Sequence, residues 1–436
     1  MRYNINTIPR RIFSFWTIPP HAILALFIVL LTCQTAAAQP NVQFEKSIKL
    51  KASEILSPDL MKSDLYSVRD LVVNDGLLNH YTVDSRFGTF KANSTLAVKQ
   101  LLLEINAIAE MKKIDTTDTA IDSVVQSGKN TVDAVANLVT DPQETLEGAV
   151  AGVSSLFNRA KQVVGKRKTT DAEDNQLEQV IGKSKSKGNI ANKFGVSVYS
   201  PNQILQEELE RLAWADYLGG IGVGLASSAV SGVGGLVLST SGAARLLNEV
   251  INTTPASELW VRNKNKLVEM EIDEDTVQLY LNNPSFSPAL QTVMVEALAG
   301  MNEVANRSLF IKIALQANTQ ELARTITEMT VMIAGYHKKV APIINVAPFG
   351  RFLYSKTKTG TAVLIFPADH ILWSERVADS ATWLLEPASG QTKPTGLQLW
   401  VLGNFSTKAQ TELQTLGWEL HENVGATLLS EKKPQS

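Results

Sequence analysis

Asp369 and His370 are the best candidates in this sequence for acid–base chemistry. They follow an apolar run that ends at Pro367, and Trp373 and Glu375 come shortly after them. An imidazole titrates near neutral pH, so a histidine beside a carboxylate can move a proton, and loops after buried strands often carry function. The structural alternative is that Asp369 caps the helix that follows and that His370 is a half-exposed ring beside it.

Other recognisable chemistry is absent from the sequence. The remaining histidines after residue 38 are His80, His337 and His421, and none forms the H-x-x-x-H or H-E-x-x-H spacing that binds zinc. No Walker loop or G-x-S-x-G turn occurs, and the glycines from Gly220 to Gly224 lack the dinucleotide-loop spacing. We therefore expect no metal and no cofactor, and the sequence leans against an enzyme.

The overall composition narrows the classes of partner. The 436 residues include 41 basic and 43 acidic side chains, and 44% are apolar. A charge so close to neutral argues against a nucleic-acid partner, which would need a basic surface. The length predicts more than one domain, and the apolar content excludes a wholly disordered chain.

Residues 1–38 have the order of a secretory signal peptide. A basic start with three arginines precedes an apolar run from Ala22 to Leu31, and small residues precede a cleavage site between Ala38 and Gln39. The apolar run is short for a membrane span, although an uncleaved anchor is the alternative. We expect export through the Sec pathway to the periplasm or outer envelope, or secretion. Because Cys33 is the only cysteine, the mature chain would have no disulfide.

Residues 39–165 are expected to form an N-terminal α+β and helical region. Short β-rich runs at Leu78 to Val83 and Thr89 to Ala92, with a Gly-containing turn between them, predict a hairpin. Apolar residues at helical spacing predict a helix from Ser94 to Lys113, capped by Ser94 or Asn93. A weaker amphipathic stretch follows from Ala120 to Val164. It would pack on its own domain or lie on lipid.

Residues 166–195 read as a charged, disordered linker between domains. This stretch mixes clustered lysines and acids with few apolar side chains, as in the Lys183 to Gly188 run. Such a composition buries too little apolar surface to offset the entropy lost on ordering.

Residues 196–345 are expected to form a helical domain. The apolar periodicity predicts helices at Pro201 to Tyr217, after Pro255, at Asp273 to Leu281, Leu290 to Met301, Leu309 to Ala317 and Thr319 to Lys339.

An uncharged, Gly-rich apolar segment from Tyr217 to Ala244 lies inside this domain. Gly220, Gly224, Ser228 and Gly232 recur at intervals of four, so on a helix they would let another backbone approach closely. The segment is either a close-packed helix or hairpin of the folded domain, or a hairpin that inserts in a membrane. The sequence leaves both open.

Residues 346–428 are expected to form a C-terminal α/β region, and residues 429–436 a disordered tail. A hairpin is predicted at Phe352 to Ser355 and Ala362 to Phe366, with a helix at Trp373 to Leu385 after it. Leu397 to Leu402, Ser406 to Leu416 and Trp418 to Val424 then predict a strand, a helix and a strand of βαβ type. The predicted fold class is thus α+β, predominantly helical.

Several stretches resemble an uncharacterised family of exported bacterial proteins that has no known activity. They are His80-Tyr-Thr-Val83, Gly88-Thr-Phe90, Leu205 to Trp214 and Leu399 to Trp418. The resemblance spans most of the chain after residue 38. It implies export and transfers no functional residue.

We therefore expect an exported bacterial envelope protein that binds a membrane or an envelope protein partner and is not catalytic. Two alternatives remain open. One is a periplasmic hydrolase with dispersed active-site residues, of which His370 and Asp369 are the first candidates. The other is a secreted protein that perforates membranes with the Gly-rich hairpin. The sequence does not indicate an oligomeric state.

Overall fold

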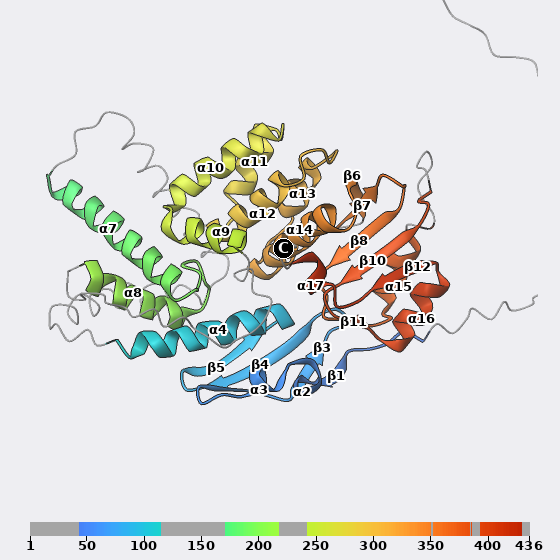
Figure 1. Cartoon of the computed structure of the whole chain (residues 1–436), viewed down its shortest axis with the longest axis horizontal. Helices are drawn as coiled ribbons and strands as arrows, with labels where there is room; N and C mark the ends of the chain where they lie inside the picture. The colour runs from blue at the N-terminus through green and yellow to red at the C-terminus, as the bar shows by residue number, and fades with distance from the viewer. Residues whose placement is uncertain are drawn as a thin grey trace, which may run out of the picture. The chain divides into compact units, whose positions relative to one another are not determined.

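The computed structural model describes residues 43–114, 171–217, 242–349, 352–383, 385 and 393–429. Helices and several sheets both occur along these residues, so the expected mixed α+β class is confirmed (Figure 1). The chain from Glu45 onward forms one compact unit. Three predicted features lie outside the described residues: the signal peptide with cleavage between Ala38 and Gln39, the amphipathic stretch at 120–164 and the tail after residue 429.

The first sheet is five-stranded and antiparallel, in the order β1-β3-β4-β2 with β5 also paired to β4. The predicted hairpin is confirmed, because β4 and β5 pair in register from Tyr81 opposite Ala92 to Ser85 opposite Gly88. Gly88 has a φ of +130°, which only glycine adopts without strain. The elements of this part are β1 (Ile48–Lys51), α2 (Ala52–Ile55), α3 (Pro58–Met61), β2 (Tyr66–Val68), β3 (Leu71–Asn74), β4 (Asn79–Ser85) and β5 (Gly88–Ala92).

Helix α4 (Thr95–Lys112) follows the hairpin as predicted, and the Ser94 side chain caps it by accepting the N–H of Ala97. Leu102 and Ile105 of α4 pack on the first sheet. Further along the same helix, Ile108 and Met111 pack among buried residues of the next two helices. One apolar stripe therefore joins the sheet to the helical part.

The predicted linker at 166–195 is wrong over most of its length, because α7 (Asp171–Lys193) is a helix. Two of its lysines are paired with the following helix, α8 (Gln203–Tyr217), where Glu210 binds Lys183 and lies 3.3 Å from Lys187. Ile190 is buried against α8 and α4. The composition alone predicts disorder, but these partners compensate the charges and cover the few apolar side chains.

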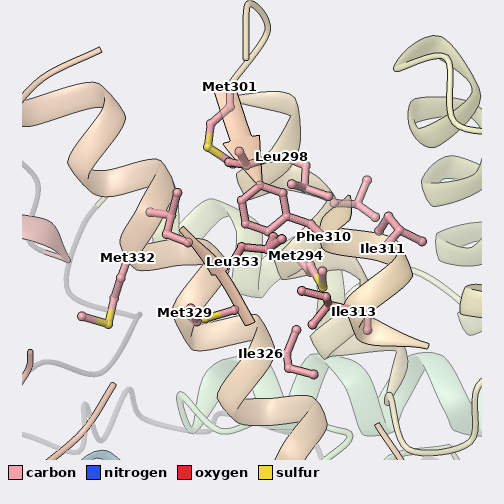
Figure 2. Close-up of a cluster of buried hydrophobic side chains, with 14 of the residues drawn as sticks. Met294, Leu298, Met301, Phe310, Ile311, Ile313, Ile326, Met329, Met332 and Leu353 are labelled. Atoms are coloured by element: carbon pink, nitrogen blue, oxygen red, sulfur yellow. The ribbon is translucent and has the colours of Figure 1, made fainter. Parts of the chain in front are cut away.

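The helical part continues through α9 (Gly242–Thr253), α10 (Ala256–Glu269), α11 (Glu274–Leu281), α12 (Pro288–Ala299), α13 (Ser308–Ala314) and α14 (Gln320–Lys339). All except α9 were predicted, and Asp273 and Thr319 cap their helices through side-chain oxygens. Figure 2 shows part of the core that these helices bury, including Met294, Phe310 and Met329.

The Gly-rich segment lies outside the described residues except at its two ends, so the placement of Gly220, Gly224, Ser228 and Gly232 is not described. Among the helices that the structure does describe, none is long and apolar enough to cross a bilayer.

The second sheet has the order β12-β10-β8-β7-β6, and β10 runs parallel to both β8 and β12. The predicted hairpin and the strand–helix–strand unit are confirmed, and the Ser406 side chain caps the crossover helix. Strand β6, which was not predicted, crosses the boundary expected after residue 345. The elements are β6 (Ile343–Phe349), β7 (Phe352–Thr357), β8 (Ala362–Phe366), β9 (His370–Ile371), α15 (Glu375–Trp383), β10 (Leu397–Val401), β11 (Asn404–Phe405), α16 (Thr407–Thr415), β12 (Trp418–His421) and α17 (Gly425–Leu428).

The helical part and the second sheet share one core. Val363 and Ile365 of β8 and Trp400 of β10 belong to the same buried cluster as Met329, Ile333 and Tyr336 of α14. The face of the sheet that carries Trp400 therefore lies against α14, which places the aromatic residues of both elements in contact.

Candidate functional site

Asp369 is a buried helix cap, although not of the helix predicted from the sequence. Its carboxylate accepts the backbone N–H of Asn79 at 2.9 Å and that of Thr95, the first residue of α4, at 3.0 and 3.1 Å. The helix after Asp369 begins only at Glu375. Burial raises the pKa of Asp369, and the hydrogen bonds from Asn79 and Thr95 oppose that rise. The residue thus ties the end of β8 to the first sheet and to α4.

His370 has different partners from its neighbour. Its ring is partly exposed and its Nδ1 is paired with Asn404 of β11, while its backbone oxygen accepts the amide of Asn74 at 3.2 Å. The two side chains of the predicted acid–base pair share no hydrogen bond in the described part of the chain. The structure therefore places the two candidates next to each other in the chain but in separate environments.

A chain of four polar side chains, which the sequence did not indicate, runs from the β3–β4 turn to α14. His80 Nε2 lies 3.1 Å from Asp75 Oδ2, and His80 Nδ1 lies 3.0 Å from Asn93 Oδ1. The Asn93 amide in turn donates to Glu321. Burial lowers the pKa of His80, but the hydrogen bonds to Asn93 and Asp75 and the charges of Asp75 and Glu321 raise it overall. Both ring nitrogens face acceptors, so the protonated imidazolium fits this position best.

Glu328 of α14 is a second titratable group that sequence reasoning missed. Burial raises the pKa of Glu328 to about 7, the charge of Arg324 opposes this rise and the charge of Asp369 adds to it. A carboxyl group that titrates near neutrality can exchange a proton at physiological pH. Its only sequence signal would have been its place on the polar side of α14, one turn after Arg324.

A cavity of 350 Å³ lies between the C-terminal end of α14 and the second sheet. Its lining comes from three places: α14 and the residues after it, the β7–β8 turn, and strands β10 and β12. The lining residues are Tyr336, Val340, Ala341, Thr357, Thr359, Thr361, Gln398, Trp400 and His421. Neither Asp369 nor Glu328 is among them.

Aromatic rings form one wall of this cavity. The indole of Trp400 is stacked on the imidazole of His421, with ring centroids 3.9 Å apart and planes 18° apart. The Tyr336 ring meets Trp400 edge-on, at 5.1 Å and 85°. These three rings come from α14, β10 and β12, so only the folded chain brings them together.

Hydrogen bonds hold the polar part of the same wall in place. The Tyr336 hydroxyl and the Trp400 indole N–H both donate to Gln398 Oε1 at 3.2 Å. The Gln398 amide then donates to Glu419 Oε2 at 2.8 Å. Gln398 is the residue through which these groups are connected, so the wall is preorganised.

A second cavity, of 460 Å³, lies at the surface of α10 and α11. It is lined by Lys264, Asn265, Val268, Glu269, Ile272 and Glu274. Lys264 and Glu274 form an ion pair of 2.6 Å with each other, so their charges are already compensated. This cavity offers less to a ligand than the one at Trp400.

No group of three or more His, Cys, Asp or Glu side chains in the described residues is arranged to hold a metal ion. Comparison of the chain with protein-family models, with curated proteins and with solved structures finds no match, so the function has to be argued from the geometry of this chain alone.

Proposed function

We propose that this chain is an exported bacterial envelope protein that acts by binding a ligand or partner and not by catalysis. The observation that carries the proposal is the cavity at Trp400, whose aromatic and polar wall is held together by hydrogen bonds through Gln398. Binding sites typically combine apolar or aromatic lining with a few fixed polar groups. Export rests on the N-terminal sequence alone.

The environment of Asp369 supports a structural role for this residue over one in acid–base catalysis. Its two oxygens already accept backbone N–H groups from β4 and from α4. Because these bonds join separate elements, protonation of the carboxylate during a reaction cycle would weaken the fold at that place. His370, paired with Asn404, has no hydrogen bond to this carboxylate.

A periplasmic hydrolase is the second candidate, and Glu328 is the observation that favours it. A carboxyl group with a pKa of about 7 is suited to general acid–base work. Under this alternative, His370→Ala or Glu328→Gln would abolish turnover of a hydrolysable ester, amide or glycoside. The membrane-perforating alternative rests only on the sequence of the Gly-rich segment, and dye release from liposomes would test it.

The binding proposal is tested by the indole N–H resonance of Trp400 in a ¹⁵N spectrum of the mature protein. The resonance is assigned by its loss in Trp400→Phe. We expect it to shift, with saturation, on titration with at least one member of a panel of small amines, sugars and carboxylates. A resonance that responds to none of them would contradict a ligand site in this cavity. Fractionation with N-terminal sequencing tests export, for which the expected first residue is Gln39.

A further inference from the structure

The cavity at Trp400 has few hydrogen-bond donors left to offer. The Tyr336 hydroxyl and the Trp400 indole N–H are used on Gln398, and the Gln398 amide is used on Glu419. In the β7–β8 turn, the Thr359 hydroxyl lies 2.9 Å from that of Thr357 and 3.3 Å from that of Thr361, which uses two of these three hydroxyl protons. Most donors of this wall are therefore already used within the protein.

The His421 ring lies next to a carboxylate. Its Nε2 lies 3.1 Å from Glu419 Oε1. Burial lowers the pKa of His421, although the nearby charge of Glu419 opposes this.

A carboxylate, that of Glu419, lies beside this end of the cavity. None of the lining side chains is lysine or arginine. Glu419 is not itself a lining residue, but it is 61% exposed and its Oε1 lies 3.1 Å from Nε2 of the lining residue His421. Glu419 also acts on Tyr336, whose pKa is raised first by burial and then by the charge of this carboxylate. A ligand here gains most by bringing both donors and positive charge.

We propose that this cavity binds a primary ammonium or guanidinium group, with the cation on the partly exposed His421 side of the Trp400–His421 stack and its N–H groups directed at Glu419. This inference rests on the binding function proposed above and specifies its ligand class. Stacked aromatic rings favour a cation beside their faces. The volume of 350 Å³ is at the lower end of ligand pockets, so it suits one small amine or a single Lys or Arg side chain of a peptide.

The test uses four probes, with the Trp400 indole resonance as the readout. Agmatine and an end-blocked Ala-Arg-Ala peptide carry the cation, and they distinguish a free amine from a protein segment as its source. Glucose and acetate represent neutral and anionic ligands. We expect saturable shifts with at least one cationic probe and none with glucose or acetate.

Two variants test the role of the carboxylate. Glu419→Gln keeps an acceptor for Gln398 but removes the charge, and should weaken cation binding about 10-fold. Glu412→Gln, on α16 and outside the lining, makes the same change of charge and should leave the affinity unchanged.

The outcomes separate this inference from the proposed function. Binding of glucose or acetate at Trp400 without cation binding would overturn the ligand class and leave a binding cavity in place. Equal cation affinity in Glu419→Gln and Glu412→Gln would also overturn it. If the resonance responds to no probe at all, both this inference and the proposed function fail.

Discussion

The carboxylate of Asp369 accepts the backbone N–H of Thr95 across 274 positions of the chain. Thr95 opens α4, so its N–H has no acceptor within the helix. A side chain from the second sheet thus completes a helix that belongs to the first sheet. The same carboxylate accepts the N–H of Asn79, which connects it to β4 as well.

Asp369→Ala is expected to lower the free energy of unfolding by about 2–4 kcal/mol, because the buried N–H of Asn79 and the partly buried N–H of Thr95 would both lose their acceptor. Urea denaturation of the mature protein measures this loss. The matched control is Asp379→Ala at an exposed position of α15, which should change stability by less than about 0.5 kcal/mol. Similar losses in the two variants would show that the capping bonds contribute little.

Gly403→Ala is expected to displace Asp369 from this position. A Cβ on Gly403 would lie 1.6 Å from the backbone oxygen of Asp369, so the chain has to move. We expect a loss of at least about 2 kcal/mol in the free energy of unfolding. At Gly396 an added Cβ would meet only Thr361 at an ordinary 3.6 Å, so Gly396→Ala serves as the control. An unchanged unfolding midpoint for Gly403→Ala would rule out the close approach.

Glu328→Gln is expected to stabilise the protein at alkaline pH. Burial raises the pKa of Glu328 from 4.5 to about 7, so the folded state binds this proton more tightly than the unfolded state. The contribution of the protonated Glu328 to the stability of the parent protein is therefore fully present below about pH 4.5 and is lost as the pH rises through about 7. At about pH 8 the variant should gain about 2–3 kcal/mol over the parent. Unfolding curves over this pH range measure the difference.

The control for Glu328 is Glu303→Gln, because Glu303 is exposed. The Glu303→Gln variant should change the free energy of unfolding by the same amount at every pH, or not at all. A gain for Glu328→Gln that is as large at about pH 4 as at about pH 8 would contradict a raised pKa for Glu328.

His80→Gln is expected to cost stability in acid more than in base. The pKa of His80 is raised above 6.5, so the contribution of its charged form is fully present below that pH and disappears as the pH rises through the folded pKa. Since the side chain is 38% exposed, solvent screens the pairing with Asp75. We expect less than about 1 kcal/mol. Thermal unfolding at about pH 5.5 and at about pH 9 compares the protein with His80 charged and neutral, and His370→Gln is the control. A larger loss of stability at about pH 9 than at about pH 5.5 would contradict a raised pKa for His80.

Local signals in the sequence identified many of the elements. Ser94, Thr319 and Ser406 each precede a helix and cap it, and the turn at Gly88 places β4 against β5. These signals work because a cap or a tight turn involves residues only a few positions apart. Strand β6 was missed because its buried and exposed residues do not alternate regularly, so its sequence lacks the period of two that marks a strand. Its pairing with β7 forms only in the folded sheet.

The sequence by itself determined the mixed class of the fold, most of the helices, the two hairpins and the strand–helix–strand unit, since each depends on short-range periodicity, capping and turn geometry. Only the tertiary structure decided that α7 is a helix, that Asp369 caps α4, and that Tyr336, Trp400 and His421 share one cavity. The physical reason is that burial and charge compensation depend on partners far away in the chain. Glu210 pairs with Lys183 and Lys187 of α7, and Gln398 connects residues of three separate elements.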